Sequence, residues 1–164
     1  MEAQVLERDT ERSLQEALDR LPLKYAVKKA LAEFVRRLHE AEGNNLLRVV
    51  LFGSMARGDY DDESDTDVFV LLREGKRAEK NRVSDIAVET AYDTAFNDPD
   101  NVEEWYTLLS PFVRTEAELK QEIMGKEAWL IEPVFVAIRE EGIPLFEKSI
   151  EEVEIGRASC RERV

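Results

Sequence analysis

The chain has 164 residues, of which 43% are hydrophobic, so it can bury one ordinary core but is too short for two full domains. Its 36 acidic residues outnumber its 23 basic residues, and the net charge of -13 would repel a nucleic-acid backbone. Every apolar run is well short of the roughly 20 residues that cross a bilayer, and the first residues lack the pattern of a secretion signal. We therefore expect one cytoplasmic domain with no nucleic-acid partner and no membrane partner.

Residues 154–164 read EIGRASCRERV, which looks like the in-frame translation of a common DNA-sequencing adapter. We expect residues 1–153 to form the domain and residues 154–164 to be a non-native tail, the alternative being a genuine disordered basic tail. The tail contains Cys160, the only cysteine, so no internal disulfide can form.

Two helices are expected first along the chain. Apolar residues recur at helical spacing over residues 11–21 and 23–41, with Pro22 between the two stretches. His39, the only histidine, lies near the end of the second stretch, where a cation favours the helix dipole. We expect it to have no metal-binding or catalytic role.

Two short apolar runs, residues 46–52 (LLRVVLF) and 65–72 (DTDVFVLL), predict buried strands. The acidic connection between them is too short for a crossover helix, which favours adjacent antiparallel strands. We expect this pair to form the centre of the sheet.

The second half of the chain predicts further helices and strands. A strand is expected over residues 105–113, where Pro111 indicates a sheet edge, a bulge or a strand end. Thr115 and Glu118 have the spacing of a capping box for a short helix that ends at Gly125. Two more helices and an edge segment are expected over residues 77–96, 131–140 and 143–146. The predicted fold class is α+β, with a small mixed or antiparallel sheet flanked by helices.

The candidate binding residues lie in the connection between the two central strands and at the start of the second strand. Gly53 lets a ligand's phosphates approach the backbone, and Ser54 adds a hydroxyl group and amides that could bind an anion. Asp65 and Asp67 are two residues apart, so on a strand their carboxylates share one face and could bind divalent cations. Arg57 could neutralise charge on a β- or γ-phosphate. The alternative, an acidic loop that binds nothing, does not explain why the acidic run joins two apolar strands.

The segment GSMARGDYDDESDTD resembles the G-S-x10-D-x-D signature of the minimal nucleotidyltransferases, within the DNA polymerase β-like superfamily. The apolar strand that ends in Phe52-Gly53-Ser54 and the apolar residues after Asp67 agree with that family too. The resemblance implies that Gly53, Ser54 and Arg57 bind a nucleoside triphosphate such as ATP. It also implies that Asp65 and Asp67 are catalytic ligands of Mg²⁺.

Family members with full transferase activity usually have a third carboxylate on the next strand. The sequence offers no clean match for it. Glu104 is the nearest candidate, with Glu103 before it, and Asp85 and Glu89 are alternatives if the preceding helix passes the site. The aromatic residues Trp105, Tyr106 and Trp129 are expected to be core residues.

The resemblance implies a nucleotidyltransferase that transfers a nucleoside monophosphate, most simply AMP, to a hydroxyl group. Minimal nucleotidyltransferases are often encoded beside a small helical HEPN protein, which implies a toxin–antitoxin pair with the HEPN toxin as acceptor. A degenerate antitoxin that binds nucleotide or partner without turnover is the first alternative. The second is transfer to a small molecule such as a cationic aminoglycoside, which the acidic charge would attract.

Overall fold

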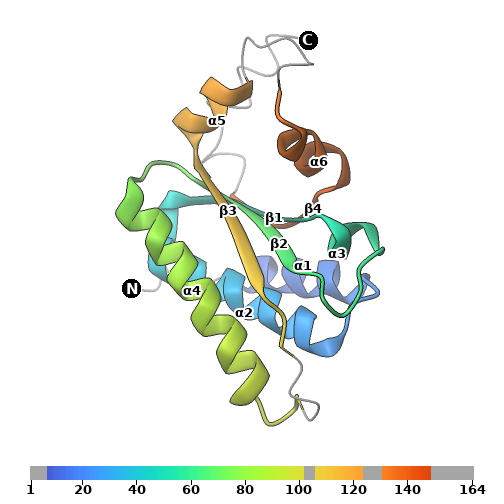
Figure 1. Cartoon of the computed structure of the whole chain (residues 1–164). Helices are drawn as coiled ribbons and strands as arrows, with labels where there is room; N and C mark the ends of the chain where they lie inside the picture. The colour runs from blue at the N-terminus through green and yellow to red at the C-terminus, as the bar shows by residue number, and fades with distance from the viewer. Residues whose placement is uncertain (1–6, 102–105, 124–130, 149–164) are drawn as a thin grey trace.

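The computed structural model describes residues 7–101, 106–123 and 131–148. Figure 1 shows a sheet with the longer helices packed against one face and short helices at its upper end. The elements in chain order are α1 (Arg8–Asp19), α2 (Tyr25–Glu42), β1 (Leu46–Phe52), α3 (Ser54–Arg57), β2 (Thr66–Leu72), α4 (Arg77–Phe96), β3 (Leu109–Thr115), α5 (Glu116–Ile123), α6 (Pro133–Glu141) and β4 (Ile143–Glu147). The predicted α+β class is confirmed.

The four strands form one mixed sheet in the order β3-β2-β1-β4. β1 pairs antiparallel with both β2 and β4, whereas β2 pairs parallel with β3. The predicted antiparallel pair at the centre of the sheet is therefore confirmed, as is the edge strand that contains Pro111. An edge position suits Pro111 because a proline has no N–H to donate to a second neighbour.

The third strand begins later than predicted. We expected it over residues 105–113, but β3 runs from Leu109 to Thr115. Its partner β2 starts only at Thr66, which pairs with Leu109, so the described residues 106–108 have no neighbouring strand with which to form a ladder. Residue 105 lies outside the described residues.

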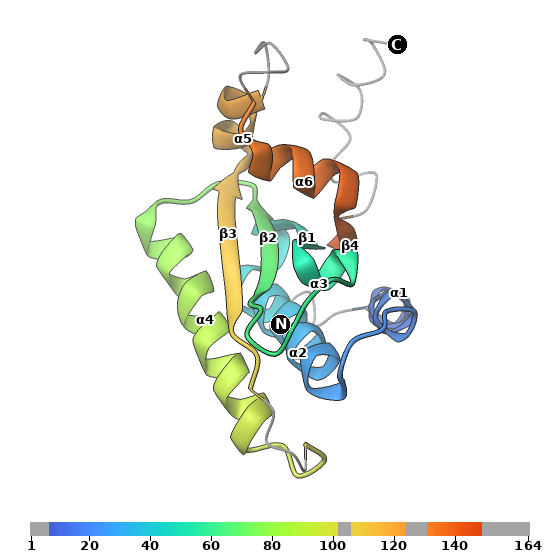
Figure 2. The same ribbon diagram turned by 45° about the vertical axis from the view of Figure 1, so that its right-hand side comes forward.

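The main core lies between one face of the sheet and the helices α1, α2 and α4 (Figure 2). Phe34 of α2, Val70 of β2 and Val83 of α4 are fully buried there. A smaller cluster on the opposite face joins strand side chains such as Val50 and Phe69 to α5 and α6. Because the central strands are covered on both faces, their sequences read as continuous apolar runs.

The helices follow their sequence signals closely. The capping box of α5 is formed, since the Glu118 N–H donates to the Thr115 hydroxyl at 3.2 Å and the Thr115 N–H donates to the Glu118 carboxylate at 2.9 Å. The four-residue helix α3 was not predicted, because one turn is too short to show a period. No described helix has the length and apolar character that a membrane span requires.

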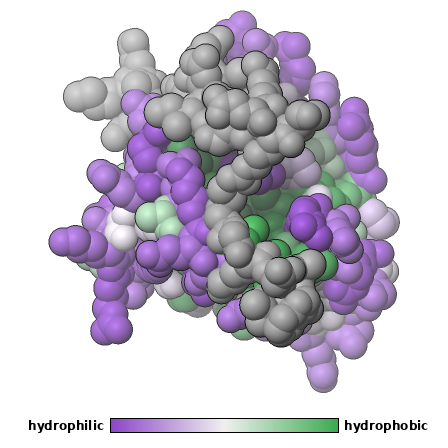
Figure 3. All heavy atoms as spheres, turned by 90° about the horizontal axis from the view of Figure 1, so that it is seen from above, coloured by the Kyte–Doolittle hydropathy of each residue, from purple (hydrophilic) through white to green (hydrophobic). Residues whose placement is uncertain are grey.

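The expectation that Tyr106 is a core residue is wrong, because its side chain is 43% exposed. Its ring stacks on Phe96 of α4, with centroids 6.4 Å apart. Trp105 and Trp129 lie outside the described residues. Figure 3, which looks down from the end with α5 and α6, shows a mostly hydrophilic surface with a hydrophobic area between the polar residues.

Candidate functional site

The candidate site begins where β1 ends and the backbone turns into α3. Gly53 has φ 78° and ψ -157°, a conformation that glycine alone adopts readily. A Cβ atom at this position would lie 2.4 Å from the Asp67 carboxylate oxygen Oδ2. Gly53 is therefore required both by the turn and by the approach of the Asp67 side chain.

Asp67 lies on β2 directly opposite Phe52, and its side chain is half-buried. Asp65 precedes the strand and is exposed. Burial raises the pKa of the Asp67 carboxyl above its usual value, the neighbouring Asp65 charge raises that pKa further, and Arg57 opposes the shift. The structure thus brings Gly53, Arg57, Asp65 and Asp67 together at one end of the central strand pair.

Ser54 and Arg57 are the first and last residues of α3, which ends at Gly58 in the left-handed conformation. The Arg57 guanidinium donates to Asp59 at 3.1 Å and to Glu141 of α6 at 3.1 Å. These two carboxylates raise the pKa of Arg57. Arg57 would have to exchange one of these carboxylates for a phosphate oxygen in order to bind a nucleotide.

The acidic connection between α3 and β2 is an ordered turn tied to the body of the molecule. Asp61 accepts hydrogen bonds from the Glu63 N–H at 2.9 Å and from the Ser64 hydroxyl at 3.2 Å. The Tyr60 hydroxyl donates to the Pro22 carbonyl oxygen at 2.8 Å. The acids of this turn, unlike Asp67, are exposed, so they form a solvated rim beside the site.

Four carboxylates are candidates for the third acid. Glu103 and Glu104 lie outside the described residues. Asp85 and Glu89 are exposed on α4, because the opposite stripe of that helix, with Val83 and Ala87, packs into the core.

The residue beside Asp67 on the neighbouring strand is Ser110. Parallel pairing of β2 with β3 places these two residues in register, so both side chains leave the same face of the sheet. Ser110 therefore occupies the place where a third carboxylate would adjoin the pair. The sequence analysis missed this residue because its position follows from the register of β3, which has no signal in the sequence.

The donor set for a metal ion consists of two carboxylates. Among the described residues there is no group of three histidine, cysteine, aspartate or glutamate side chains that could hold an ion. Asp65 and Asp67 offer hard oxygen ligands of the kind that Mg²⁺ prefers, and a triphosphate would supply the remaining oxygens. These two residues fit such an ion.

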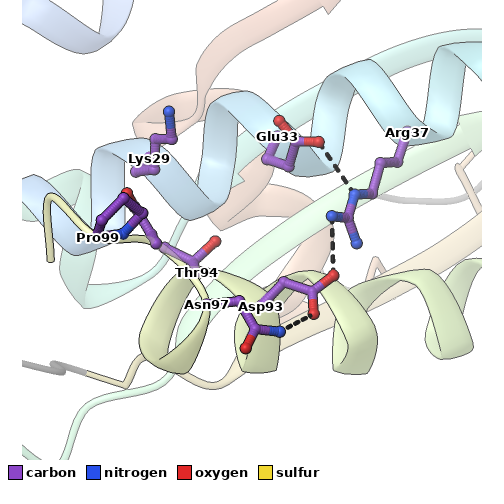
Figure 4. A pocket seen from close by; sticks show the side chains of 8 residues that line it. Lys29, Glu33, Arg37, Asp93, Thr94, Asn97 and Pro99 are labelled. Carbon is purple, nitrogen blue, oxygen red and sulfur yellow. Dashed lines mark hydrogen bonds and ion pairs between the residues drawn. The ribbon is translucent and has the colours of Figure 1, made fainter.

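Two hollows lie elsewhere on the molecule. One, of about 410 Å³, lies between α2 and the end of α4, where Arg37 donates to Glu33 at 3.1 Å and to Asp93 at 2.9 Å (Figure 4). The other, of about 360 Å³, lies between α1 and β4. Neither is lined by a residue of the candidate site.

A glycine–serine turn between two central antiparallel strands, with an acidic pair at the start of the second, defines a nucleotidyltransferase-type domain. Comparison with known families agrees: residues 28–153 match the nucleotidyltransferase domain family, and the chain belongs to it.

Two proteins of Methanocaldococcus jannaschii, each named "Putative protein adenylyltransferase", resemble part of the chain. One is 50% identical over 44 residues, or 27% of this chain, and the other is 44% identical over 43 residues, or 26% of this chain. The chain spans only 44% and 43% of the length of these relatives. The crystal structure of a protein from Sulfolobus solfataricus that is described as a "putative nucleotidyltransferase" aligns with 87% of this chain and with 91% of its own chain, at 16% sequence identity and a TM-score of 0.39.

Proposed function

We propose that this protein transfers a nucleoside monophosphate, AMP from ATP, to a hydroxyl group of a protein in a Mg²⁺-dependent reaction. The observation that carries the proposal is the close approach of the Asp67 carboxylate to the Gly53 turn, with Asp65 and Arg57 beside it. Membership of the nucleotidyltransferase domain family supports the reaction type. The names of the two archaeal relatives support a protein acceptor and adenylate as the group transferred.

Asp65 and Asp67 would hold the Mg²⁺. The half-buried Asp67 is costly to ionise beside Asp65, and a cation between the two carboxylates would offset that cost. The bound ion would favour ionisation of the attacking hydroxyl and stabilise the charge of the leaving pyrophosphate.

The chain's own residues would position the nucleotide. The absence of a side chain at Gly53 leaves the backbone open to the phosphates, and the Ser54 hydroxyl would donate to a phosphate oxygen. Arg57 would exchange Glu141 for a β- or γ-phosphate oxygen. In the transfer, the acceptor oxygen would form a bond to the α-phosphorus while the bond from that phosphorus to the oxygen between the α- and β-phosphates breaks. Pyrophosphate would leave with that oxygen, and the proton of the acceptor hydroxyl would pass to water.

The proposed acceptor is a partner protein, and a HEPN-type toxin is the class that the sequence resemblance favours. Transfer of AMP to such a toxin would make this chain an antitoxin. The second candidate function is an antitoxin that binds nucleotide or its partner without turnover. Ser110 favours this alternative, because a serine cannot serve as the third carboxylate beside Asp67.

The test is incubation of the full chain with Mg²⁺, a HEPN-type protein encoded beside it, and ATP labelled at either the α- or the γ-phosphate. Transfer of AMP labels the acceptor from α-labelled ATP only and adds one or more AMP units to its intact mass. Asp67→Asn should abolish the label. Asp62→Asn, which changes an acid whose side chain is 80% exposed, is the matched control and should retain it. Nucleotide binding without label would favour the second candidate, and absence of both would contradict the site assignment.

A further inference from the structure

Four large apolar side chains are exposed on the side of the molecule formed by α4 and by Tyr106, which precedes β3. They are Val88, Tyr92, Phe96 and Tyr106, each between 43% and 57% exposed. We call this set the aromatic strip. Exposed apolar side chains that gather in this way mark interaction surfaces far more often than isolated ones do.

The helical part of the strip is one face of α4. Val88, Tyr92 and Phe96 are spaced four residues apart, so they lie along one side of the helix. The rings of Tyr92 and Phe96 are 5.0 Å apart between centroids, and Tyr106 stacks on Phe96 with an angle of 20° between the ring planes. The three rings therefore form a continuous surface that runs from the helix to the residue Tyr106 before β3.

The chain that follows Tyr106 lies against the start of β2. The Thr66 N–H donates to the carbonyl oxygen of Leu108 at 2.8 Å, and the Thr66 hydroxyl lies 2.5 Å from that of Thr107. Asp67 follows Thr66, but its side chain leaves the opposite face of the sheet from α4, because Val68 and Val70 are the residues of β2 that pack towards the helices. A protein seated on the strip would therefore lie at the same end of the sheet as the acidic pair, on the other face.

The acidic residues beside the strip favour a basic partner. Asp85 and Glu89 lie on the same side of α4 as Tyr92 and Phe96, and both are exposed. A second copy of this chain would bring its own Asp85 and Glu89 against the first pair, in addition to a second net charge of -13. A protein surface with apolar residues between lysine or arginine residues would complement the strip instead.

We propose that the aromatic strip is the docking surface for a partner protein that presents an apolar face flanked by basic side chains. The docking follows from the strip itself, whereas the role of the docked protein as AMP acceptor rests on the proposed function. Docking at this end of the sheet would tether the acceptor near the nucleotide and raise the effective concentration of its hydroxyl group.

The test uses three labelled helical peptides and the full chain, with binding measured by fluorescence anisotropy. The first peptide has a leucine and tyrosine face flanked by lysine and arginine, the second has the same face flanked by glutamate, and the third has the basic residues with alanine in place of the apolar face. We expect the first to bind at least about tenfold more tightly than either of the others.

Variants of the chain locate the binding. Tyr92→Gln and Phe96→Gln place a good helix former at an exposed position and should weaken the first peptide's binding about tenfold with the thermal midpoint preserved. Asp85→Asn and Glu89→Gln should weaken it about threefold and reduce its salt dependence. Glu40→Gln removes an exposed carboxylate of α2 and is the matched control, which should bind as the wild type does.

Equal binding of the first and third peptides, or binding unaffected by Tyr92→Gln and Phe96→Gln, would overturn the proposal. So would a wild-type dimer in sedimentation equilibrium that Phe96→Gln dissociates, because the strip would then bind a second copy. ATP binding in the presence of Mg²⁺ should be unchanged in Phe96→Gln. Peptide binding that survives while no protein receives label from α-labelled ATP would leave the docking surface intact and remove the proposed function.

Discussion

Gly53 is constrained by both the backbone and a side chain of the candidate site, and a pair of glycine variants separates the two effects. Gly53 and Gly58 both have positive φ, of 78° and 84°, but only at Gly53 would a Cβ atom meet a neighbour. Gly58→Ala should therefore cost about 1 kcal/mol of unfolding free energy from backbone strain. Gly53→Ala should cost about 2–3 kcal/mol more, since it also displaces the Asp67 carboxylate.

Urea unfolding measures both costs, and calorimetry of ATP binding with Mg²⁺ shows whether the site is affected. Gly53→Ala should lose nucleotide binding, whereas Gly58→Ala should retain it. Equal losses of stability in the two variants would show that the contact with Asp67 contributes nothing.

The Asp67 carboxylate is expected to lower the free energy of unfolding when no cation is bound to it. In the absence of a divalent cation, Asp67→Asn should raise the free energy of unfolding at neutral pH by about 1 kcal/mol, because it removes a half-buried charge beside Asp65. Asp62→Asn should leave it unchanged. The measurement is urea unfolding in EDTA, and a stability loss in Asp67→Asn would contradict the prediction.

The difference in unfolding free energy between Asp67→Asn and the wild type should depend on pH, with a sign that follows from the direction of the Asp67 pKa shift. The folded-state pKa of Asp67 is raised above its usual value, so the folded protein binds the proton more tightly than the unfolded chain. The contribution of Asp67 to stability therefore falls as pH rises from the usual value to the raised one. The advantage of Asp67→Asn over the wild type should be largest above this window and should shrink as pH falls through it.

At the scale of elements, the parallel pairing of β2 with β3 decides which residue adjoins Asp67. Ser110→Asp would place a third carboxylate there and, under the proposed function, should raise the rate of AMP transfer at least about tenfold. The same variant should lower stability without cation, because a third acid joins Asp65 and Asp67. Ser84→Asp, on the exposed side of α4, adds the same charge away from the site and is the control. A rate that Ser110→Asp leaves unchanged would show that this position takes no part.

Part of the fold could be predicted from the sequence, and the register of β3 could not. The bounds of β1 and α4 could be predicted from the sequence, because a continuous apolar run and a helical period are local signals. So could the pairing of β1 with β2, whose short connection leaves few alternatives. The role of Ser110 could not, because the register of β3 depends on packing between segments distant in the chain. Tyr106 was misassigned because aromatic composition does not reveal which side of a segment faces the core.

Contacts between elements also link the stability of α5 to pH. Lys80 of α4 forms an ion pair with Glu118 of α5 at 2.6 Å, and this hydrogen bond is the main reason that the pKa of Glu118 lies below its usual value. A lowered pKa means that the contribution of Glu118 is present above its usual pKa and is lost as pH falls through the lowered one. Both side chains are about one-third exposed, so Glu118→Gln should cost no more than about 1 kcal/mol at neutral pH. Glu40→Gln is the control, and an unfolding difference that persists at acidic pH would contradict the linkage.

At the scale of the whole molecule, the net charge of -13 would repel the triphosphate that the candidate site is proposed to bind. Most binding sites for a polyphosphate lie in a positive field, which gathers the ligand and weakens as salt is added. Under the proposed function, the field of the molecule would repel ATP, and the local attraction would come from Arg57 and a cation held by Asp65 and Asp67. Nucleotide binding would then depend on the divalent cation, and the same charge would favour basic partners over nucleic acids.

This opposition predicts an unusual salt dependence. Between about 50 and 500 mM KCl the Debye length falls severalfold, so the repulsion between the acidic molecule and ATP is increasingly screened. We therefore expect the Kd for ATP at saturating Mg²⁺ to stay constant or to fall about twofold over this range. The basic peptide used to test the aromatic strip provides the internal comparison, because its attraction to the same molecule should weaken as salt is added. Calorimetry of ATP and anisotropy of the peptide on one preparation give both slopes. A nucleotide affinity that falls with salt as steeply as the peptide's would mean that local positive charge, and not the cation held by the acidic pair, dominates recognition of the triphosphate.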